Sequence, residues 1–544
     1  MQNAKTESSS EKIASQDRAM QFFFARLGRH LETCAAWLEL RPVLLLLLLA
    51  GLYCGWILHH EHGNMLWHDE LYTFYIAQAP SFRTMLHWAN TVDLNPPLYY
   101  IAARFCMHIL PAGRLAVRLP SIVAYAVAML CAYMFVSRRL TPLYGVLSAF
   151  ILMMPYFSLY ALQARPYALV LACLGIAAIS WQSAQGARSF SRYTGLAGVF
   201  LGGLGMLLSH VLAVFALAAL MVAEAARAMS RRKIDWPMTA ALCLPWVACI
   251  TYLPLLRHHA TQVYPPAFQG TPVMLGAQFA YLWMLIAPFL AMTAVILVLL
   301  GPTGDAERAL RQDLSREETI FALGLLAVPL ATVLLFMHAH AAYFVRYGLV
   351  SGLGLAILFP HWFAQWSKNS SRNALVACVV FLFAAFPIAS LAKRVKQNFF
   401  LKPIPVQMSG SANIRLESIQ RGLPFVDASG LTFLEMNRRE TPEFLKRVYY
   451  LEDSVADMQY AHATIFEELS IVKTIFPIRA QVEDYAQFTQ QHRQFLVLGT
   501  YTYPEDWLLR KLRADGARLE FLGISDNTYK DHELYLVTMK PDQR

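Results

Sequence analysis

The sequence predicts a polytopic α-helical membrane protein that carries an α/β domain outside the membrane. Of its 544 residues, 57% are hydrophobic and only 15% are charged, whereas a soluble domain normally carries about a quarter charged residues. Apolar runs of about 20 residues, the length that crosses a bilayer as a helix, recur along the chain. After residue 392 the composition becomes that of a soluble domain. The chain therefore divides into an N-terminal segment at 1–42, a membrane region at 43–391 and a domain at 392–544.

Eleven segments of the membrane region are predicted to be spans. The segment 97–111 is excluded, because it is short for a span and carries Arg104 and His108. We predict that it lies in the membrane interface as a helix, with Tyr99 and Tyr100 at headgroup depth. The predicted spans are 43–59, 119–136, 143–161, 166–184, 195–209, 211–226, 237–254, 273–300, 319–338, 347–366 and 373–391.

The distribution of basic residues orients these spans, because cytoplasmic loops are enriched in Lys and Arg. With a cytoplasmic N-terminus, each cytoplasmic loop carries at least two basic residues. The loops on the other side then contain only Arg165, Arg257 and Arg346, besides the long first loop. Residues 60–118 are therefore predicted to form one external loop, and the C-terminal domain to lie outside the cytoplasm. These loops account for the net charge of +10, which therefore does not indicate nucleic-acid binding.

The C-terminal residues alternate short apolar segments with amphipathic ones. "PFVDAS", "VYYLED", "QFLVLGT", "RLEFLGISD" and "HELYLVTM" are typical of strands, and "PEDWLLRKLRADGA" is typical of an amphipathic helix. This alternation predicts a small α/β domain with a largely parallel sheet. Its sequence contains no glycine-rich phosphate loop. We therefore interpret the domain as a docking or acceptor-positioning module without catalytic groups.

Asp69, Glu70 and Asp93 are three of the carboxylates in the predicted first external loop. Acidic residues in a loop are often only solvated. Adjacent carboxylates repel each other, however, so Asp69 and Glu70 beside a membrane require a compensating cation, metal or substrate. Asp93 precedes Asn95 and two prolines, which stiffen the backbone. A carboxylate on a stiff turn suits general-base catalysis, which requires accurate placement.

Three arginines are predicted to lie at the same external level: Arg118, Arg165 and Arg346. A single arginine at a span end often extends to lipid headgroups. Three on the side where positive charge is scarce favour a shared anionic ligand, because guanidinium forks bind phosphate oxygens in two-point contacts. A lone histidine at a span end, such as His210, is also typical of a helix cap. Other side chains suited to positioning a substrate at this level are His68, Tyr167, Tyr347 and His210.

These motifs resemble the integral-membrane glycosyltransferases of the GT-C fold, in particular the bacterial relatives of family 39. That group includes protein O-mannosyltransferases, the lipid A aminoarabinose transferase and the Rgt-type lipopolysaccharide galacturonosyltransferases. The resemblance covers about residues 43–390 and rests on the order of "WHDELYT", "DLNPPLYY", "RLPS", "YALQARPYAL" and "FVRYGLVSGLGLAIL". The chain departs from the pattern at Asn95, where relatives commonly have His or Lys. It departs again at Gln163 and Ala164, where an acidic residue is common.

The resemblance implies transfer of a sugar from a polyprenyl-phosphate donor to an envelope acceptor: lipopolysaccharide, another glycan, a lipid or a protein. The location it implies is the outer face of a bacterial inner membrane. A single displacement would invert the anomeric configuration. A lipid monophosphate leaving group gives less reason to require a metal, although adjacent Asp69 and Glu70 leave a divalent metal open. The expected roles are catalysis by Asp69 and Glu70, phosphate binding by Arg118, Arg165, Arg346 and Tyr347, and positioning by His68, Asp93, Asn95, Tyr167 and His210.

Two functions of other classes are also considered. A transporter or flippase of lipid-linked substrates would place ionisable residues near the bilayer midplane and would contain an internal repeat. Here the charges gather at one face, and the two halves of the sequence are not repeats of each other. A non-catalytic scaffold for envelope assembly would use the external domain to recruit partners.

Overall fold

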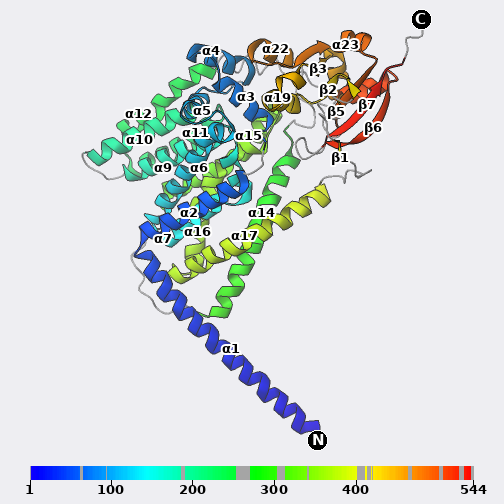
Figure 1. The fold of residues 1–544 in the computed structure, drawn as a ribbon. Helices are drawn as coiled ribbons and strands as arrows, with labels where there is room; N and C mark the ends of the chain where they lie inside the picture. The colour runs from blue at the N-terminus through cyan, green and yellow to red at the C-terminus, as the bar shows by residue number, and fades with distance from the viewer. Residues whose placement is uncertain are drawn as a thin grey trace.

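The computed structural model describes residues 2–61, 65–93, 95–184, 190–252, 270–302, 313–339, 342–400, 411–412, 418, 421–462, 468–501, 507–525 and 532–540. A helical body extends to residue 400, and a seven-stranded sheet with its own helices follows. Figure 1 shows the sheet at one side of the helical body and α1 (Gln2–Glu39) extending away from it. The architecture is therefore helical with a C-terminal α/β domain, as the sequence predicts.

Every predicted span overlaps a helix of the structure. Five of the described helices (α2, α6, α11, α14 and α15) are long and apolar enough to cross a membrane, and α7 with the following turns forms a sixth candidate that is bent by 59°. The number of crossings, eleven, stays a prediction. The helices are α2 (Pro42–Glu61), α6 (Arg114–Ser137), α7 (Pro142–Leu152), α8 (Pro155–Ser158), η2 (Leu159–Leu162), α9 (Tyr167–Ser183), α10 (Phe190–Leu207), α11 (Ala213–Arg231), α12 (Trp236–Cys243), η3 (Leu244–Thr251), α14 (Pro272–Leu300), α15 (Arg316–His338), α16 (Ser351–Trp366) and α17 (Ser371–Phe400).

The bend after α7 follows from Pro155, which lacks an N–H group and is suited to the first turn of a new helix. The chain then passes through the short 3-10 helix η2 before α9 begins at Tyr167. This broken segment brings Ala164 and Arg165 to helix α3 (His68–Ala77), where both donate hydrogen bonds.

The predicted first external loop folds into α3 (His68–Ala77), α4 (Phe82–Trp88), a π-helical turn at Ala89–Asp93 and α5 (Leu98–Ile109). The helix predicted within 97–111 is thus confirmed as α5. The placement of its tyrosines among headgroups is wrong, because Tyr99 and Tyr100 are buried inside the protein. The Tyr99 hydroxyl donates to the Val117 carbonyl, since a buried phenol requires a partner. The exposed side of α5 carries other apolar residues, among them Phe105 and Ile109.

The C-terminal sheet has the strand order β1-β6-β7-β5-β2-β3-β4. β2 pairs in parallel with β3 and β5, β3 with β4, and β1 with β6, whereas β7 runs antiparallel to β5 and β6. The predicted, largely parallel sheet is confirmed, although β1 and β4 are not anticipated by the sequence. The strands are β1 (Ser411–Ala412), β2 (Phe425–Asp427), β3 (Val448–Glu452), β4 (Gln481–Asp484), β5 (Gln494–Gly499), β6 (Arg518–Ser525) and β7 (Glu533–Thr538). The helices are α19 (Gly430–Arg439), α20 (Pro442–Leu445), α21 (Ser454–Ala456), η6 (Asp457–Ala461), α22 (Glu468–Ile475), α23 (Tyr485–Gln491) and α24 (Trp507–Ala514).

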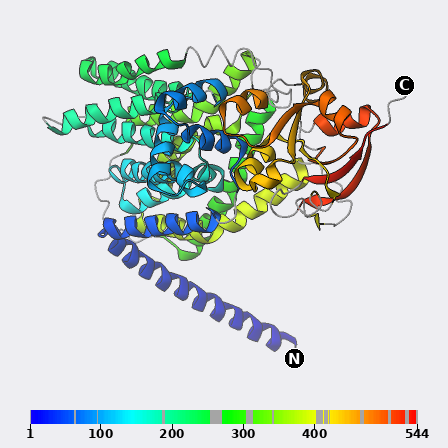
Figure 2. The ribbon, with the colours of Figure 1, turned by 45° about the horizontal axis from the view of Figure 1, so that its top comes forward.

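The C-terminal domain packs against the first loop. Figures 1 and 2 both show α3 beside this domain, and one hydrophobic cluster contains side chains of both, including Tyr75 and Leu434. The Tyr75 hydroxyl donates to the Leu434 carbonyl at 3.1 Å, and the Asn437 side chain donates to that hydroxyl at 2.9 Å. The Tyr75 ring also stacks on Phe476, with a centroid separation of 5.1 Å. The domain therefore supports the helix whose first turn carries Asp69.

Candidate active site

Helix α3 places two of the predicted carboxylates in its first turn. Trp67 occupies the N-cap position, and its backbone N–H donates to Glu70 Oε2 at 2.8 Å. Negative charge at this end is also favoured by the helix dipole. Because successive helix residues point about 100° apart, Asp69 and Glu70 meet different partners.

Glu70 is buried against Arg118. The Nε and Nη2 groups of Arg118 donate to Oε1 and Oε2 of Glu70, both at 2.8 Å, and the Ala164 N–H donates to Oε1 at 2.7 Å. Arg118 also donates to Glu61 Oε2 at 2.8 Å and to the Met65 carbonyl at 2.7 Å. One guanidinium thus joins the end of α2, the start of α3 and the start of α6. Phosphate binding by Arg118 stays a prediction, whereas these contacts favour a positioning role.

Asp93 holds a second arginine. Arg165 Nη1 and Nη2 donate to Oδ2 and Oδ1 of Asp93 at 2.5 and 2.9 Å. Tyr100 donates to Oδ2 at 2.6 Å, and Asn95 Nδ2 donates to Oδ1 at 3.1 Å. Burial, and then the charge of Asp93, raise the pKa of Tyr100 well above its usual value, so its phenol stays a donor. Both oxygens of Asp93 thus accept hydrogen bonds from donors of the protein itself. Asp93 is therefore better suited to holding Arg165 than to accepting a proton.

Asp69 is the most accessible of the three carboxylates, with 21% of its side chain exposed. Arg346 Nη2 lies 3.0 Å from Asp69 Oδ2, and Arg165 Nε lies 3.8 Å from the same oxygen. Arg165 Nη1 also donates to the backbone carbonyl of Asp69 at 3.0 Å. Arg346 comes from a 3-10 turn, η5 (Val345–Gly348), just before α16. Two arginines from distant segments therefore converge on Asp69.

Each of these two arginines has a buried N–H group without a hydrogen-bond acceptor in the described part of the chain. The two atoms are Nε of Arg165 and Nε of Arg346. Leaving a buried donor unsatisfied costs free energy, and both donors belong to cations. The acceptor that best satisfies them is therefore an anion with several oxygens, such as a phosphate.

Aromatic rings surround Arg346. Its guanidinium carbon lies 4.2 Å from the ring centroid of Phe344 and 5.9 Å from that of Tyr167. The His210 ring lies 5.2 Å from Tyr167 and 5.8 Å from Tyr347, measured between centroids. Aromatic faces favour a cation without occupying its N–H donors. The structure thus brings Tyr167, Tyr347 and His210 together with Arg346.

The remaining candidates lie in several places. His68 begins α3, but its side chain lies outside the described part of the structure. Asn95 contacts Asp93. His210 also accepts a hydrogen bond from the Leu212 N–H at 3.1 Å, a contact that fits the alternative role of His210 as a helix cap. Sequence reasoning missed the roles of Tyr100 and Phe344, although Tyr100 lies within the quoted "DLNPPLYY" and Phe344 within "FVRYGLVSGLGLAIL".

The metal alternative for Asp69 and Glu70 does not fit the geometry. Both Glu70 oxygens accept hydrogen bonds from protein donors. Among the described residues, no group of three or more His, Cys, Asp or Glu side chains gathers as metal ligands would. We therefore assign no shared metal ion to Asp69 and Glu70.

The sequence model of the family described as dolichyl-phosphate-mannose-protein mannosyltransferase matches residues 94–252. The glycosyltransferase resemblance is confirmed over this segment. It includes Arg118, Arg165 and His210, whereas Asp69 and Arg346 lie outside it. No curated protein sequence matches the chain significantly.

Among the solved structures that are similar to the chain are two states of one protein. ArnT from Cupriavidus metallidurans bound to undecaprenyl phosphate is 11% identical, with a TM-score of 0.49, and the match covers 90% of this chain and 97% of that one. The apo state of the same ArnT is 10% identical, with a TM-score of 0.48, and the match covers 91% and 97% of the two chains.

Proposed function

We propose that this protein is a glycosyltransferase that moves a sugar from a polyprenyl-phosphate donor to an acceptor at the outer face of a bacterial inner membrane. The observation that carries the proposal is the convergence of Arg165 and Arg346 on Asp69, with a buried N–H of each arginine left for an anion. The family match supports a sugar donor linked to a lipid phosphate.

In the proposed reaction, Asp69 accepts the proton of an acceptor hydroxyl as the hydroxyl oxygen attacks the anomeric carbon. The bond between that carbon and the phosphate oxygen breaks, and its electron pair leaves with the lipid phosphate. A single displacement of this kind inverts the anomeric configuration. Arg346, 3.0 Å from Asp69, favours the ionised carboxylate before the proton transfer.

Arg346 and Arg165 hold the departing phosphate. Arg165 is fixed in advance by Asp93, and Arg346 by the aromatic rings of Phe344 and Tyr167. Cations fixed before the reaction stabilise developing charge without the cost of reorganising solvent.

The Glu70–Arg118 pair positions α3 rather than the donor. Glu70, predicted to be catalytic, is engaged by Arg118, the Trp67 N–H and the Ala164 N–H. Arg118, predicted to bind phosphate, is engaged by two carboxylates. This role extends to the C-terminal domain, which contacts the same helix through Tyr75.

Asp69→Asn tests the proposal, because it keeps the size of the side chain and removes its basicity. The probe is undecaprenyl phosphate, and its binding to the purified full chain in nanodiscs should survive the substitution. Transfer of radiolabelled sugar from lipid-linked donors to an envelope fraction should fall by about 10²–10⁴, the usual share of general-base catalysis. Near wild-type transfer by Asp69→Asn would reject the mechanism. Mass spectrometry of envelope glycans from a deletion strain would identify the sugar and the acceptor.

A further inference from the structure

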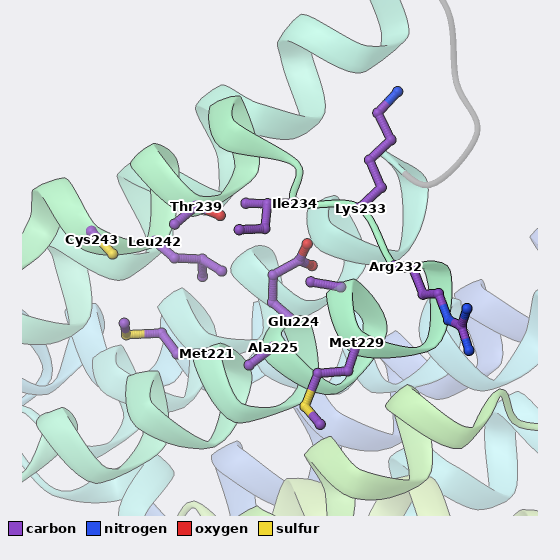
Figure 3. A pocket seen from close by; sticks show the side chains of 11 residues that line it. Met221, Glu224, Ala225, Met229, Arg232, Lys233, Ile234, Thr239, Leu242 and Cys243 are labelled. Carbon is purple, nitrogen blue, oxygen red and sulfur yellow. The ribbon is translucent and has the colours of Figure 1, made fainter.

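A cavity lies between the second half of α11 and the following helix α12. Its volume is about 440 Å³, within the range of small-molecule sites. Figure 3 shows that its wall is mostly apolar, formed by side chains such as Met221, Ala225, Met229 and Leu242. Ala225 and Met229 are exposed. The cavity is therefore open to the surroundings of the helical body.

The acidic groups near this cavity already have basic partners. Glu224 accepts from Trp181 Nε1 at 2.8 Å and is paired with Arg227. Asp235 accepts from Arg192 at 2.6 and 2.7 Å. The protein therefore compensates both negative charges by itself.

The rim of the cavity carries two further cations, Arg232 and Lys233. Both are exposed, and neither forms an ion pair with a carboxylate within the part of the chain that the structure describes. Figure 3 shows both side chains extending away from Glu224. The mouth of the cavity is therefore positive and its wall apolar.

The backbone at Arg232 is unusual. Its φ of 51° lies in the left-handed region, at the position after α11 where glycine or asparagine is the usual residue. An arginine adopts this conformation at a cost in free energy.

The cavity is far from the candidate active site. α11 begins at Ala213, close to His210, and runs 19 residues to Arg231. At 1.5 Å per residue this is about 28 Å, close to the thickness of the hydrocarbon core of a bilayer. By the predicted topology the cavity therefore lies in the cytoplasmic leaflet, opposite Asp69.

We propose that this cavity binds an anionic phospholipid of the cytoplasmic leaflet. An acyl chain lies against Met221, Ala225 and Met229, and the phosphate is bound by Arg232 and Lys233. Long basic side chains reach headgroups while their stems stay in apolar surroundings. Basic pockets between membrane helices on the cytoplasmic side are suited to anionic headgroups. A zwitterionic lipid offers no net charge to these two cations, so charge selects the anionic lipid.

Native mass spectrometry of the purified full chain, titrated with dioleoyl phosphatidylglycerol or dioleoyl phosphatidylcholine, tests this proposal. Wild type should retain phosphatidylglycerol more tightly. Arg232→Gln with Lys233→Gln should lower phosphatidylglycerol affinity by about 10- to 30-fold, as expected for two basic residues at a membrane surface, and leave phosphatidylcholine unchanged. The matched control, Arg26→Gln with Arg29→Gln, neutralises two exposed arginines of α1 and should leave both affinities unchanged.

Ala225→Trp probes the apolar wall and should weaken binding of both lipids by filling the cavity. Equal affinity of wild type for the two lipids would overturn the proposal. So would a doubly neutralised variant that behaves like the α1 control. The two charge substitutions lie on the exposed surface, so their effect on lipid binding tests the proposal even if the tryptophan variant does not fold.

Discussion

Arg118 and Glu70 form a buried two-point ion pair in which both hydrogen bonds measure 2.8 Å. Removing one partner of a buried pair typically costs about 3–5 kcal/mol, and in Glu70→Gln this cost is reduced because Glu61 still pairs with Arg118. We therefore expect Arg118→Ala and Glu70→Gln each to lower the thermal stability of the purified chain and to reduce sugar transfer. The measurement is thermal unfolding in detergent beside a transfer assay.

A phosphate-binding role for Arg118 makes a different prediction. Both variants would still lose the buried ion pair, but Arg118→Ala would weaken binding of undecaprenyl phosphate much more than Glu70→Gln does. If both variants change the binding of undecaprenyl phosphate to the same extent, Arg118 has a positioning role, because Glu70 cannot bind a phosphate.

Arg346 is expected to contribute directly to donor binding, since one of its N–H groups is buried without an acceptor among the described residues. Removing one partner of a buried charge pair costs about 2–5 kcal/mol. Arg346→Gln should therefore weaken undecaprenyl phosphate binding by about 30-fold or more. Arg346→Lys should restore only part of the affinity, because an ammonium group cannot form the two-point contact of a guanidinium. Arg83→Gln, at an exposed arginine of α4, is the matched control. Wild-type affinity in Arg346→Gln would refute the assignment.

The hydrogen bonds of Tyr75 connect the C-terminal domain with α3. Tyr75→Phe removes an acceptor for Asn437 and a donor to the Leu434 carbonyl, so we expect a loss of about 1–3 kcal/mol. Hydrogen exchange of the full chain should speed up in both α3 and α19. Tyr193→Phe, at a tyrosine that is 72% exposed, should leave both helices unchanged. Faster exchange in α19 alone would argue against coupling between the two.

Asp427, at the end of β2, gives the C-terminal domain a dependence on pH. Burial raises the pKa of Asp427 to about 7, whereas an aspartate in an unfolded chain has a pKa of about 3.9. Folding therefore favours the protonated form. The stability that this form contributes is complete below about pH 4 and is lost as pH rises through 7.

Asp427→Asn should remove this dependence, because an amide can still accept from Ser429 N–H and Thr432. At pH 8 the variant domain should be more stable than wild type by about 2–4 kcal/mol, and the difference should shrink at pH 5. Hydrogen exchange of β2, β3 and β5, corrected for its intrinsic pH dependence, measures the stability difference at pH 8 and at pH 5. A variant that is less protected at pH 8 would contradict the expectation.

The predicted topology can be tested with reporters of location. Alkaline phosphatase fused after residue 400 should be active, and fusions after residues 140, 190 and 230 should be inactive, because the enzyme works only outside the cytoplasm. A cytoplasm-only reporter at the same positions should give the opposite pattern. Phosphatase activity after residue 140 or 230 would reject the orientation, and with it the leaflet assigned to the anionic lipid.

Local patterns in the sequence determined much of the fold. Apolar runs near the length of a bilayer span predicted the positions of the membrane helices, because burial in lipid requires continuous apolar surface. The strands β2, β3 and β5 could be predicted because their residues are mostly buried, which requires short runs of apolar residues. β4 (Gln481–Asp484) could not, because it is short, only partly buried and polar at both ends.

The sequence also predicted that Arg118, Arg165 and Arg346 lie at one level of the membrane region, and in the structure all three contact Asp69 or Glu70. It did not determine their pairing. Asp69 and Glu70 are adjacent in the chain, yet only the tertiary structure decided that Glu70 is buried against Arg118 and that Asp69 faces Arg346. The reason is physical: neighbours on a helix point about 100° apart. Each side chain is therefore assigned its partner by the packing of helices that lie far away in the sequence.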